Sequence, residues 1–378
     1  MGLIKIVLIF LLLVHGIIHL MGFAMAYEMV DVSSVIQEIT PFAGILWLLE
    51  GLLLLSILTL HDFGIRLWPL IGILALILSQ TLIVAYWSDA RYGTLVNMVL
   101  LIWLLPSVGD YRFNKSIEKE KQEVLRSDPP LQEVVTNDQL QHLPEIVRRW
   151  LNRSGVVNSP KISAVSLQQV GKMRVGVNNE WMPFVAQQFF NTTEHSFLWT
   201  SKLQMMPLLY LTGMDKLYQG QGQMKIKLLS LLEVVNEVPN YKINTATMIR
   251  YLAEICWFPT AALSEEISWR EVDPHSASAT FTLGSTSVSG LFKFNDDGDI
   301  TSFEAMRYRD GGPDATKMLW VVTNTSYQHF DGMYLPNKSE VSWINGDESF
   351  HWLTLEVTDW SANHLPHTWI VADKFKVY

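Results

Sequence analysis

The sequence predicts a membrane-embedded helical bundle followed by a soluble domain made mainly of antiparallel β-sheet. Almost all of the apolar excess of the 378-residue chain lies before residue 109, in runs long enough to cross a bilayer. After Pro160 the apolar residues recur at every second position, as in strands with one buried face. We therefore predict a transmembrane bundle over residues 1–109, a charged juxtamembrane linker over 110–137 and a β-rich domain over 138–378.

Four apolar runs are the predicted membrane spans. They cover residues 3–25, 41–60, 67–87 and 94–108. The first run is too long for the apolar core of a signal peptide and further runs follow it, so we expect it to remain in the membrane. The fourth run is the shortest, with Trp87, Tyr92 and Trp103 as interfacial anchors. The alternative to four spans is three.

The basic residues near the span ends predict the orientation. If the N-terminus is cytoplasmic, the following basic residues share that side: Lys5, Arg66, Arg112, Lys115, Lys119 and Lys121. Only Arg91 then lies on the other side, in agreement with the positive-inside bias. This places the C-terminal domain in the cytoplasm. A count of three spans would move it to the opposite side.

Five polar residues interrupt the predicted spans: His15, His19, Glu50, Gln80 and Asn97. His15 and His19 are four positions apart, so a helix places both on one face. Counted from the span ends, Glu50 and Gln80 lie near the depth of His15, whereas Asn97 lies near that of His19. Ionisable groups inside a bilayer are costly and tend to face partners or water. We call these five residues the intramembrane polar cluster.

Three roles fit the intramembrane polar cluster. The first, which we favour, is hydrogen bonding across helices that fixes the packing of the bundle. The second is a proton or quinone site, and the third is a metal or haem held by imidazoles. Two histidines on one helix face cannot clamp a haem from both sides, and a metal would need a further ligand such as Glu50. We therefore predict no bound metal or cofactor.

The β-rich domain is predicted to be a curved sheet or partial barrel with one or two helices packed against it. The clearest alternating runs lie at residues 165–177, 279–283, 288–294 and 353–357. Asn345-Gly346 lies between two apolar runs and fits a tight hairpin turn. A helix is predicted from Asn137 or Asp138 to Gly155. Apolar residues at helical spacing predict another helix, which follows Asn244 and ends at Pro259.

Four charged residues of the β-rich domain are candidates for an anion-binding pocket. Arg250 and Glu254 are one helical turn apart, and Arg307 and Arg309 point to the same face of one strand. Guanidinium groups match the geometry of carboxylates and phosphates. The alternative is a solvated ion pair with two edge arginines, which is the more common arrangement. Abundant aromatic residues could either line an apolar cavity or fill the core.

Composition and motifs exclude several classes of function. A net charge of −9 without a long basic run argues against binding of nucleic acid. Cys256 is the only cysteine, which rules out a disulfide framework. No Walker loop, Rossmann fingerprint, nucleophile elbow or zinc-protease motif is present, so no catalytic residue can be assigned. Whether the protein is an enzyme stays open.

Four segments resemble a family of uncharacterised bacterial membrane proteins. They are HGIIHLMGF at 15–23, WSDARYGTLVNM at 87–98, RYLAEICWFP at 250–259 and SWREVDPHSASATF at 268–281. The family is known as a domain of unknown function, so the resemblance implies no activity or cofactor. More distantly, the β-rich part is similar to the half-barrel of lipoprotein carriers of the LolA type, which implies an apolar concavity. Those carriers work outside the inner membrane, opposite to the side predicted from charge.

Three hypotheses for the function follow. The leading one is a membrane-tethered module that binds a lipid or another lipophilic ligand, with the bilayer as its main partner. The second is a redox or proton-linked membrane component that uses His15, His19 and Glu50. The third is an enzyme that acts on a lipid-like anionic substrate.

Overall fold

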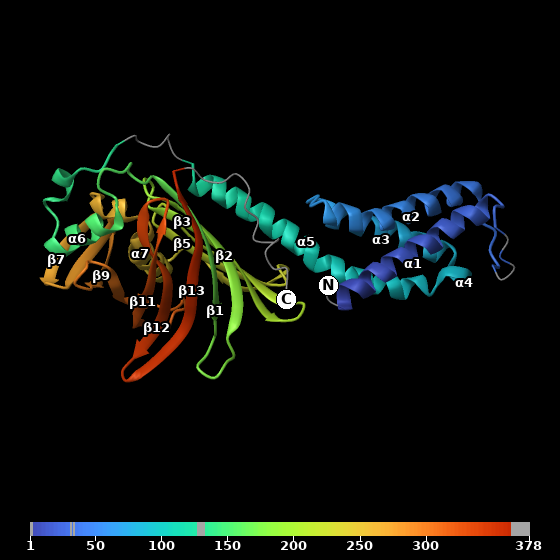
Figure 1. Ribbon diagram of the computed structural model, residues 1–378. Helices are drawn as coiled ribbons and strands as arrows, with labels where there is room; N and C mark the ends of the chain where they lie inside the picture. Colours follow the sequence, from blue (N-terminus) through green and yellow to red (C-terminus); the bar gives the residue numbers. More distant parts are fainter. Residues whose placement is uncertain (1–2, 31, 33–34, 127–132, 364–378) are drawn as a thin grey trace. The chain divides into compact units, whose positions relative to one another are not determined.

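The computed structural model describes residues 3–30, 32, 35–126 and 133–363 (Figure 1). The chain divides into two compact units, Met1–Lys115 and Ser116–Tyr378. Each unit has a core of its own and is described separately.

The first unit is a bundle of apolar helices. Its elements are α1 (Leu3–Ala26), α2 (Pro41–Asp62), α3 (Trp68–Ala85), the short α4 (Trp87–Ala90) and the start of α5 (Gly93–Val124). Four of these helices, α1, α2, α3 and α5, are long and apolar enough to cross a membrane, as predicted. Large apolar side chains such as Phe10, Phe42 and Ile102 are exposed on the bundle, as expected for a surface that faces lipid.

Small residues bring α1 and α2 close together. A Cβ atom on Gly51 would lie 2.9 Å from the carbonyl oxygen of Gly16, and one on Gly22 would lie 2.6 Å from the Trp47 ring. Close backbone approach at glycine is a usual means of packing helices in lipid, where no hydrophobic force drives them together. The glycines in the apolar runs therefore serve the packing of the bundle.

Helix α5 is longer than the predicted fourth span. It continues without a break from Gly93 to Val124 and includes Pro106. The sequence contains no further proline before residue 124, so the apolar span and the charged juxtamembrane stretch form one helix. In the second unit, the carbonyl oxygen of Val124 accepts a hydrogen bond from Asn191 Nδ2 at 3.0 Å, which joins the end of α5 to the sheet.

The segment before the sheet differs from its prediction. Instead of one helix, it contains a 3-10 turn, η1 (Asn137–Leu140), and then α6 (Glu145–Ser154). Pro144 separates them, because a proline disfavours helical geometry in the residue before it. Gly155 ends α6 with a φ of +84°, the left-handed conformation that suits glycine.

A 13-stranded antiparallel sheet forms the body of the second unit. Its strands are β1 (Ala164–Met173), β2 (Met182–Asn191), β3 (Ser196–Met206), β4 (Leu209–Tyr218), β5 (Gln221–Leu228), β6 (Leu232–Glu237), β7 (Ile267–Asp273), β8 (Ser276–Leu283), β9 (Thr286–Phe294), β10 (Ile300–Tyr308), β11 (Lys317–Phe330), β12 (Met333–Asn345) and β13 (Glu348–Ala362). Every strand pairs with its neighbour in sequence except where α7 intervenes, and β1 pairs with β13 to join the two halves. The sheet curves into a half-barrel, which confirms the predicted architecture (Figure 1).

Helix α7 (Tyr241–Glu254) links the two edges of this sheet. It follows the edge strand β6 and leads, through the 3-10 turns η2 (Ile255–Trp257) and η3 (Pro259–Leu263), into the other edge strand β7. Along this path α7 packs against β4 and β5 of one half and β8, β9 and β10 of the other. The helix therefore lies across the curved sheet and covers part of its inner face (Figure 1).

The start of α7 and the end of β1 differ from their predictions. The N-cap of α7 is Asn240, whose side chain accepts hydrogen bonds from two backbone N–H groups, whereas Asn244 bonds to the neighbouring strand. Strand β1 ends at Met173 and not at residue 177. Val175 and Val177 are exposed beyond it, so their alternation does not mark a buried strand face.

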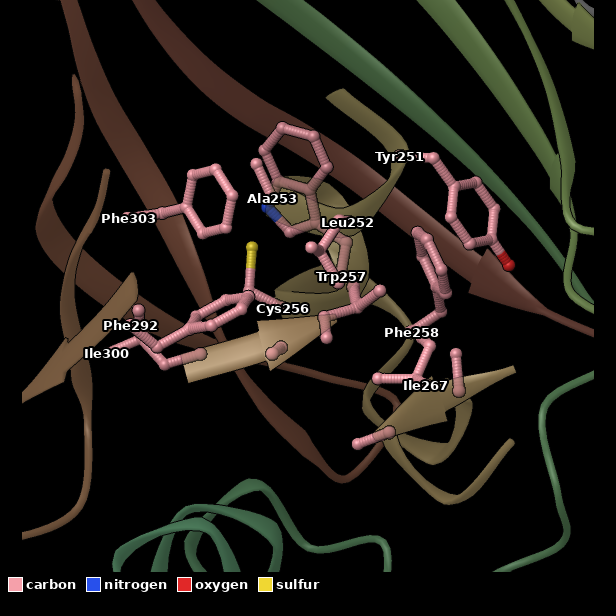
Figure 2. Packing of buried hydrophobic residues seen from close by; sticks show 14 of the residues in the cluster. Tyr251, Leu252, Ala253, Cys256, Trp257, Phe258, Ile267, Phe292, Ile300 and Phe303 are labelled. Atoms are coloured by element: carbon pink, nitrogen blue, oxygen red, sulfur yellow. The ribbon is translucent and has the colours of Figure 1, made fainter. Parts of the chain in front are cut away.

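The RYLAEICWFP segment forms the centre of the hydrophobic core. Figure 2 shows Tyr251, Leu252, Trp257 and Phe258 among buried aromatic side chains from the strands. Trp257 Nε1 donates a hydrogen bond to the carbonyl oxygen of Pro336 at 2.9 Å, which satisfies the indole within the core. The most specific motif of the sequence thus has a packing role.

Candidate binding pocket

The curved sheet and α7 enclose a pocket of about 360 Å³. Strands from both halves of the sheet contribute to its wall, as do α7 and η2. Most of the lining side chains are apolar, among them Met173, Phe184, Leu203, Met214, Trp320 and Trp352. Part of the inner face of the half-barrel is therefore hollow, although much of the rest is a filled aromatic core.

Arg250 lies at the centre of the polar part of the pocket. Its Nη1 is 2.6 Å from Asp215 Oδ2 on β4, and its Nε is 2.8 Å from Glu254 Oε1 one turn along α7. The guanidinium also lies 5.0 Å from the ring centre of Phe197 and 5.1 Å from that of Trp199. Burial acts to lower the pKa of Arg250, but the two carboxylates outweigh it and raise the pKa. Arg250 is thus a buried and fully paired cation.

A chain of buried polar groups extends from Glu254 across the sheet. Gln188 Nε2 donates to Glu254 Oε2 at 2.7 Å, and Gln169 Nε2 lies 3.4 Å from the amide oxygen of Gln188. Trp199 Nε1 donates to Gln169 Oε1 at 2.8 Å. Burial raises the pKa of Glu254, and the bonds from Arg250 and Gln188 oppose that rise. This chain holds the polar end of the pocket in a fixed arrangement.

Arg307 points into the same pocket from β10. Its Nε donates to the carbonyl oxygen of Ala246 on α7 at 2.9 Å. The guanidinium stacks near two indoles, 4.7 Å from the ring centre of Trp320 and 5.6 Å from that of Trp343. Within the described ranges, no carboxylate forms an ion pair with Arg307. Burial lowers the pKa of Arg307 to about 10, so the group still carries its charge at neutral pH.

Two further arginines line the pocket near an exposed edge. Arg174 donates to the carbonyl oxygens of His351 at 2.8 Å and Val177 at 2.9 Å. Arg309 is largely exposed, and its guanidinium lies 5.6 Å from the Phe350 ring centre. Neither arginine has an acidic partner among the residues that the structure describes.

The four candidate residues Arg250, Glu254, Arg307 and Arg309 all line this one pocket. Arg250 and Glu254 are not a solvated surface pair, because their side chains are only 16% and 12% exposed. The sequence analysis did not identify Asp215, whose carboxylate forms the second ion pair with Arg250. The signal for it was a charged residue at an inward-facing position of an alternating strand, between Gly213 and Leu217.

In the helical bundle, four of the five residues of the intramembrane polar cluster join one hydrogen-bonded network. His15 Nε2 lies 2.9 Å from Asn97 Oδ1, and Asn97 Nδ2 donates to Gln80 Oε1 at 3.1 Å. His19 Nε2 lies 2.9 Å from Ser79 Oγ, which also lies 3.1 Å from Asn97 Oδ1. Ser79, whose Oγ also lies 3.2 Å from His15 Nε2, therefore connects His19 to the rest of the network. Sequence reasoning missed it because a serine is easily tolerated in an apolar helix.

Glu50 is the member of the cluster that stays outside this network. Its side chain is fully buried, and neither carboxyl oxygen has a hydrogen-bond partner among the described residues. Nδ1 of His19 is likewise without a described partner. Among the described residues, no group of three or more His, Cys, Asp or Glu side chains could hold a metal.

Comparisons with known proteins identify a family but no activity. Among solved structures, the chain is similar to a DUF1329 family protein from Desulfovibrio piger ATCC 29098, with 10% sequence identity and a TM-score of 0.34, over 58% of this chain and 90% of that one. No curated protein matches the chain. The profile of a family of unknown function, DUF6544, matches residues 133–355, more than half of the sequence. As the sequence segments indicated, the chain therefore belongs to a family of unknown function, DUF6544.

Proposed function

We propose that this protein is a membrane-tethered binding module for a lipid or another lipophilic ligand. The observation that carries the proposal is the hollow between the curved sheet and α7. Its volume of about 360 Å³ lies within the range of sites for small molecules, and its wall is mainly apolar with a few fixed polar groups. Burial of an acyl chain in such a wall is favourable by about 0.8 kcal/mol per methylene group.

The apolar helices support a location next to a source of such ligands. Four of them are long and apolar enough to cross a membrane. Tethering raises the effective concentration of a binding site at the surface where its ligand resides. The positive-inside bias supports a cytoplasmic position for the β-rich domain.

The pocket supports binding more than a reaction. Cys256 lines the pocket and is the only cysteine of the chain, and burial raises the pKa of its thiol. A thiol that stays protonated is a poor nucleophile. The two acidic groups of the pocket, Asp215 and Glu254, are both held by Arg250 and so are not free to act as bases.

Analysis of co-purifying lipids tests the proposal. Full-length protein is purified in a mild detergent, and bound molecules are extracted and identified by mass spectrometry. Val322 lines the pocket, so Val322→Trp fills part of the space, whereas Val234→Trp adds the same ring at an exposed position on β6. We expect a near-stoichiometric amphiphile with the wild type and with Val234→Trp, and a large loss with Val322→Trp. Equal lipid content in all three proteins would contradict the proposal.

A second candidate function is proton transfer within the bundle, favoured by one observation. Glu50 is fully buried in a bundle that also holds a histidine-containing network, but it bonds to none of the described members of that network. Such intramembrane groups commonly serve proton pathways. Proteoliposomes with an internal pH-sensitive dye would show proton entry under an applied potential with the wild type and less with Glu50→Gln. Identical traces for the two proteins would remove this candidate.

A further inference from the structure

The pocket carries an excess of positive charge. Five basic and two acidic side chains line it: Arg174, Lys225, Arg250, Arg307, Arg309, Asp215 and Glu254. This is a formal surplus of three positive charges, in a protein whose net charge is −9. Among the basic side chains of the pocket, both acidic groups pair with Arg250, so the surplus belongs to the other basic side chains.

Arg307 is the member of this set that is best placed to receive an anion. It is held against Trp320 and Trp343, and its Nε is taken by the carbonyl oxygen of Ala246. This bond fixes the plane of the guanidinium. No other hydrogen bond joins Arg307 to a described residue, so both terminal amino groups are free of hydrogen-bond partners among the described residues, and the residue lines the pocket. A pair of terminal amino groups is the fork that binds two oxygens of one carboxylate or phosphate.

An unpaired guanidinium in such a place is costly for the protein. Burial of a charge without a partner opposes folding, and buried charges in proteins are usually paired or bind a ligand. Asp215 and Glu254 act on Arg307 electrostatically but lie beyond ion-pair distance, and each already bonds to Arg250. Arg307 is therefore a partly buried cation without an acidic partner in the described chain, and an anion that enters the pocket would supply one.

We propose that the ligand is an amphiphile with a carboxylate or phosphate head, bound by Arg307, and with an acyl chain along the apolar wall. This inference rests on the proposed lipophilic-ligand function and names the chemical class of the ligand. The head group lies inside the pocket beside Arg307, with Arg309 and Arg174 adding positive charge nearby. Arg250 has a different role. The carboxylates of Asp215 and Glu254 that pair with it repel an anion, and the three side chains together fix the structure of the polar end of the pocket.

The test compares ligands that differ only in the head group. Full-length protein in nanodiscs is titrated with hexadecanoate and with hexadecan-1-ol, and protein-free nanodiscs correct for partitioning. We expect wild-type protein to bind the carboxylate about tenfold or more tightly than the alcohol, as charge-assisted hydrogen bonds allow. Arg307→Gln should abolish this preference and change the alcohol affinity by less than about twofold. Arg270→Gln, on the exposed side of β7, should keep the preference.

Three outcomes would overturn the inference, and they can be told apart. If Arg307→Gln keeps the preference for the carboxylate, Arg307 is not the head-group site. Inorganic phosphate and hexadecyl phosphate are titrated in the same way, and if the two bind equally tightly, the pocket is a site for a free anion and the amphiphile class is wrong. If neither hexadecanoate nor hexadecan-1-ol binds to the wild type, the proposed function itself fails.

The fold of the variants is checked by thermal unfolding. Because Arg307→Gln removes a partly buried charge that has no acidic partner among the described residues, we expect it to unfold at or above the wild-type temperature in the absence of ligand. Arg307→Lys provides a second variant, which keeps the charge but loses the fork. It should weaken carboxylate binding by several-fold, and wild-type affinity for hexadecanoate in Arg307→Lys would contradict bidentate recognition.

Discussion

At the scale of single residues, the pocket holds two arginines in opposite situations. Arg250 neutralises Asp215 and Glu254, and all three side chains are largely buried. Arg307 lies in the same pocket without an acidic partner among the described residues. The ion pairs of Arg250 stabilise the fold, whereas the guanidinium of Arg307 is free to bind a ligand. Substitutions of the two arginines should therefore have different effects.

Replacement of Arg250 should destabilise the protein strongly. Arg250→Leu leaves two buried carboxylates without their cation, which typically costs about 3–5 kcal/mol. The measurement is the free energy of unfolding from denaturant titration in detergent. Lys338→Gln, which removes one partner of an exposed ion pair with Glu356, is the matched control and should cost about 0–1 kcal/mol. Similar costs for both variants would show that the pair on Arg250 is not structural.

His195 should make the second unit sensitive to mild acid. It lies in the turn between β2 and β3, with Nε2 2.9 Å from Ser264 Oγ and 3.3 Å from Glu266 Oε2. Burial lowers the pKa of His195 below its usual value, and Glu266 opposes that effect only in part. The unfolded chain therefore takes up a proton first, at a pKa of about 6.5, and stability falls as pH drops below that value.

The pH effect can be measured by thermal unfolding at about pH 7.5 and pH 5.5. Wild-type protein should lose more stability between these conditions than His195→Asn, since asparagine suits the positive φ of +47° and has no proton to gain. His142→Asn, at an exposed position, serves as the control and should behave like the wild type. An equal loss in wild type and His195→Asn would assign the acid sensitivity to other groups.

At the scale of elements, α7 determines whether the pocket exists. It brings Arg250 and Glu254 to one side of the half-barrel and accepts a hydrogen bond from Arg307 through the carbonyl oxygen of Ala246. Its close approach to β5 depends on Gly222. A Cβ atom there would lie 2.3 Å from Thr247 Oγ1 and 2.9 Å from the carbonyl oxygen of Ile243.

A side chain at Gly222 should therefore displace α7. Gly222→Ala forces the helix or the strand to move, and overpacking of this kind costs about 1–3 kcal/mol. We expect both lower stability and weaker binding of hexadecanoate. Gln223→Ala, one position along β5 and on the other face of the strand, should leave both unchanged. Wild-type binding by Gly222→Ala would mean that the position of α7 does not set the pocket.

The sequence could predict the features of these elements that depend on local pattern, but not those that depend on long-range pairing. Alternation in β1, β8, β9 and β13 and the turn at Asn345-Gly346 were predictable because each depends on neighbouring residues, and Gly346 has the expected positive φ of +59°. The pairing of β1 with β13 and the path of α7 between the two edges depend on residues far apart in sequence. For the same reason Arg250 and Glu254 were predicted to share one face, whereas Asp215, 35 positions away, was not.

At the scale of the whole molecule, the number of apolar helices predicts the side of the membrane on which the β-rich domain lies. An even number of spans places both ends of the chain on one side, and the basic residues near the spans predict that this side is the cytoplasm. A pocket at the cytoplasmic face would receive its ligand from the inner leaflet or from soluble enzymes. A pocket on the opposite side of the membrane would receive its ligand from other sources.

Cysteine labelling would test the predicted side. The native Cys256 is buried, so labelling should report engineered positions. Asp347→Cys places a thiol in the exposed turn between β12 and β13, and Ser88→Cys places one in the exposed α4 segment between the third and fourth apolar helices. With a membrane-impermeant maleimide, we expect intact cells to label Ser88→Cys only and permeabilised cells to label both. Labelling of Asp347→Cys in intact cells would reverse the orientation.

A high-resolution map of the full-length protein, prepared with hexadecanoate in nanodiscs, tests most directly whether the half-barrel holds an amphiphile. We expect continuous density for the acyl chain between the curved sheet and α7, with the carboxylate within hydrogen-bond distance of the terminal amino groups of Arg307. A pocket closed by its own side chains, or density that places the carboxylate away from Arg307, would contradict this expectation.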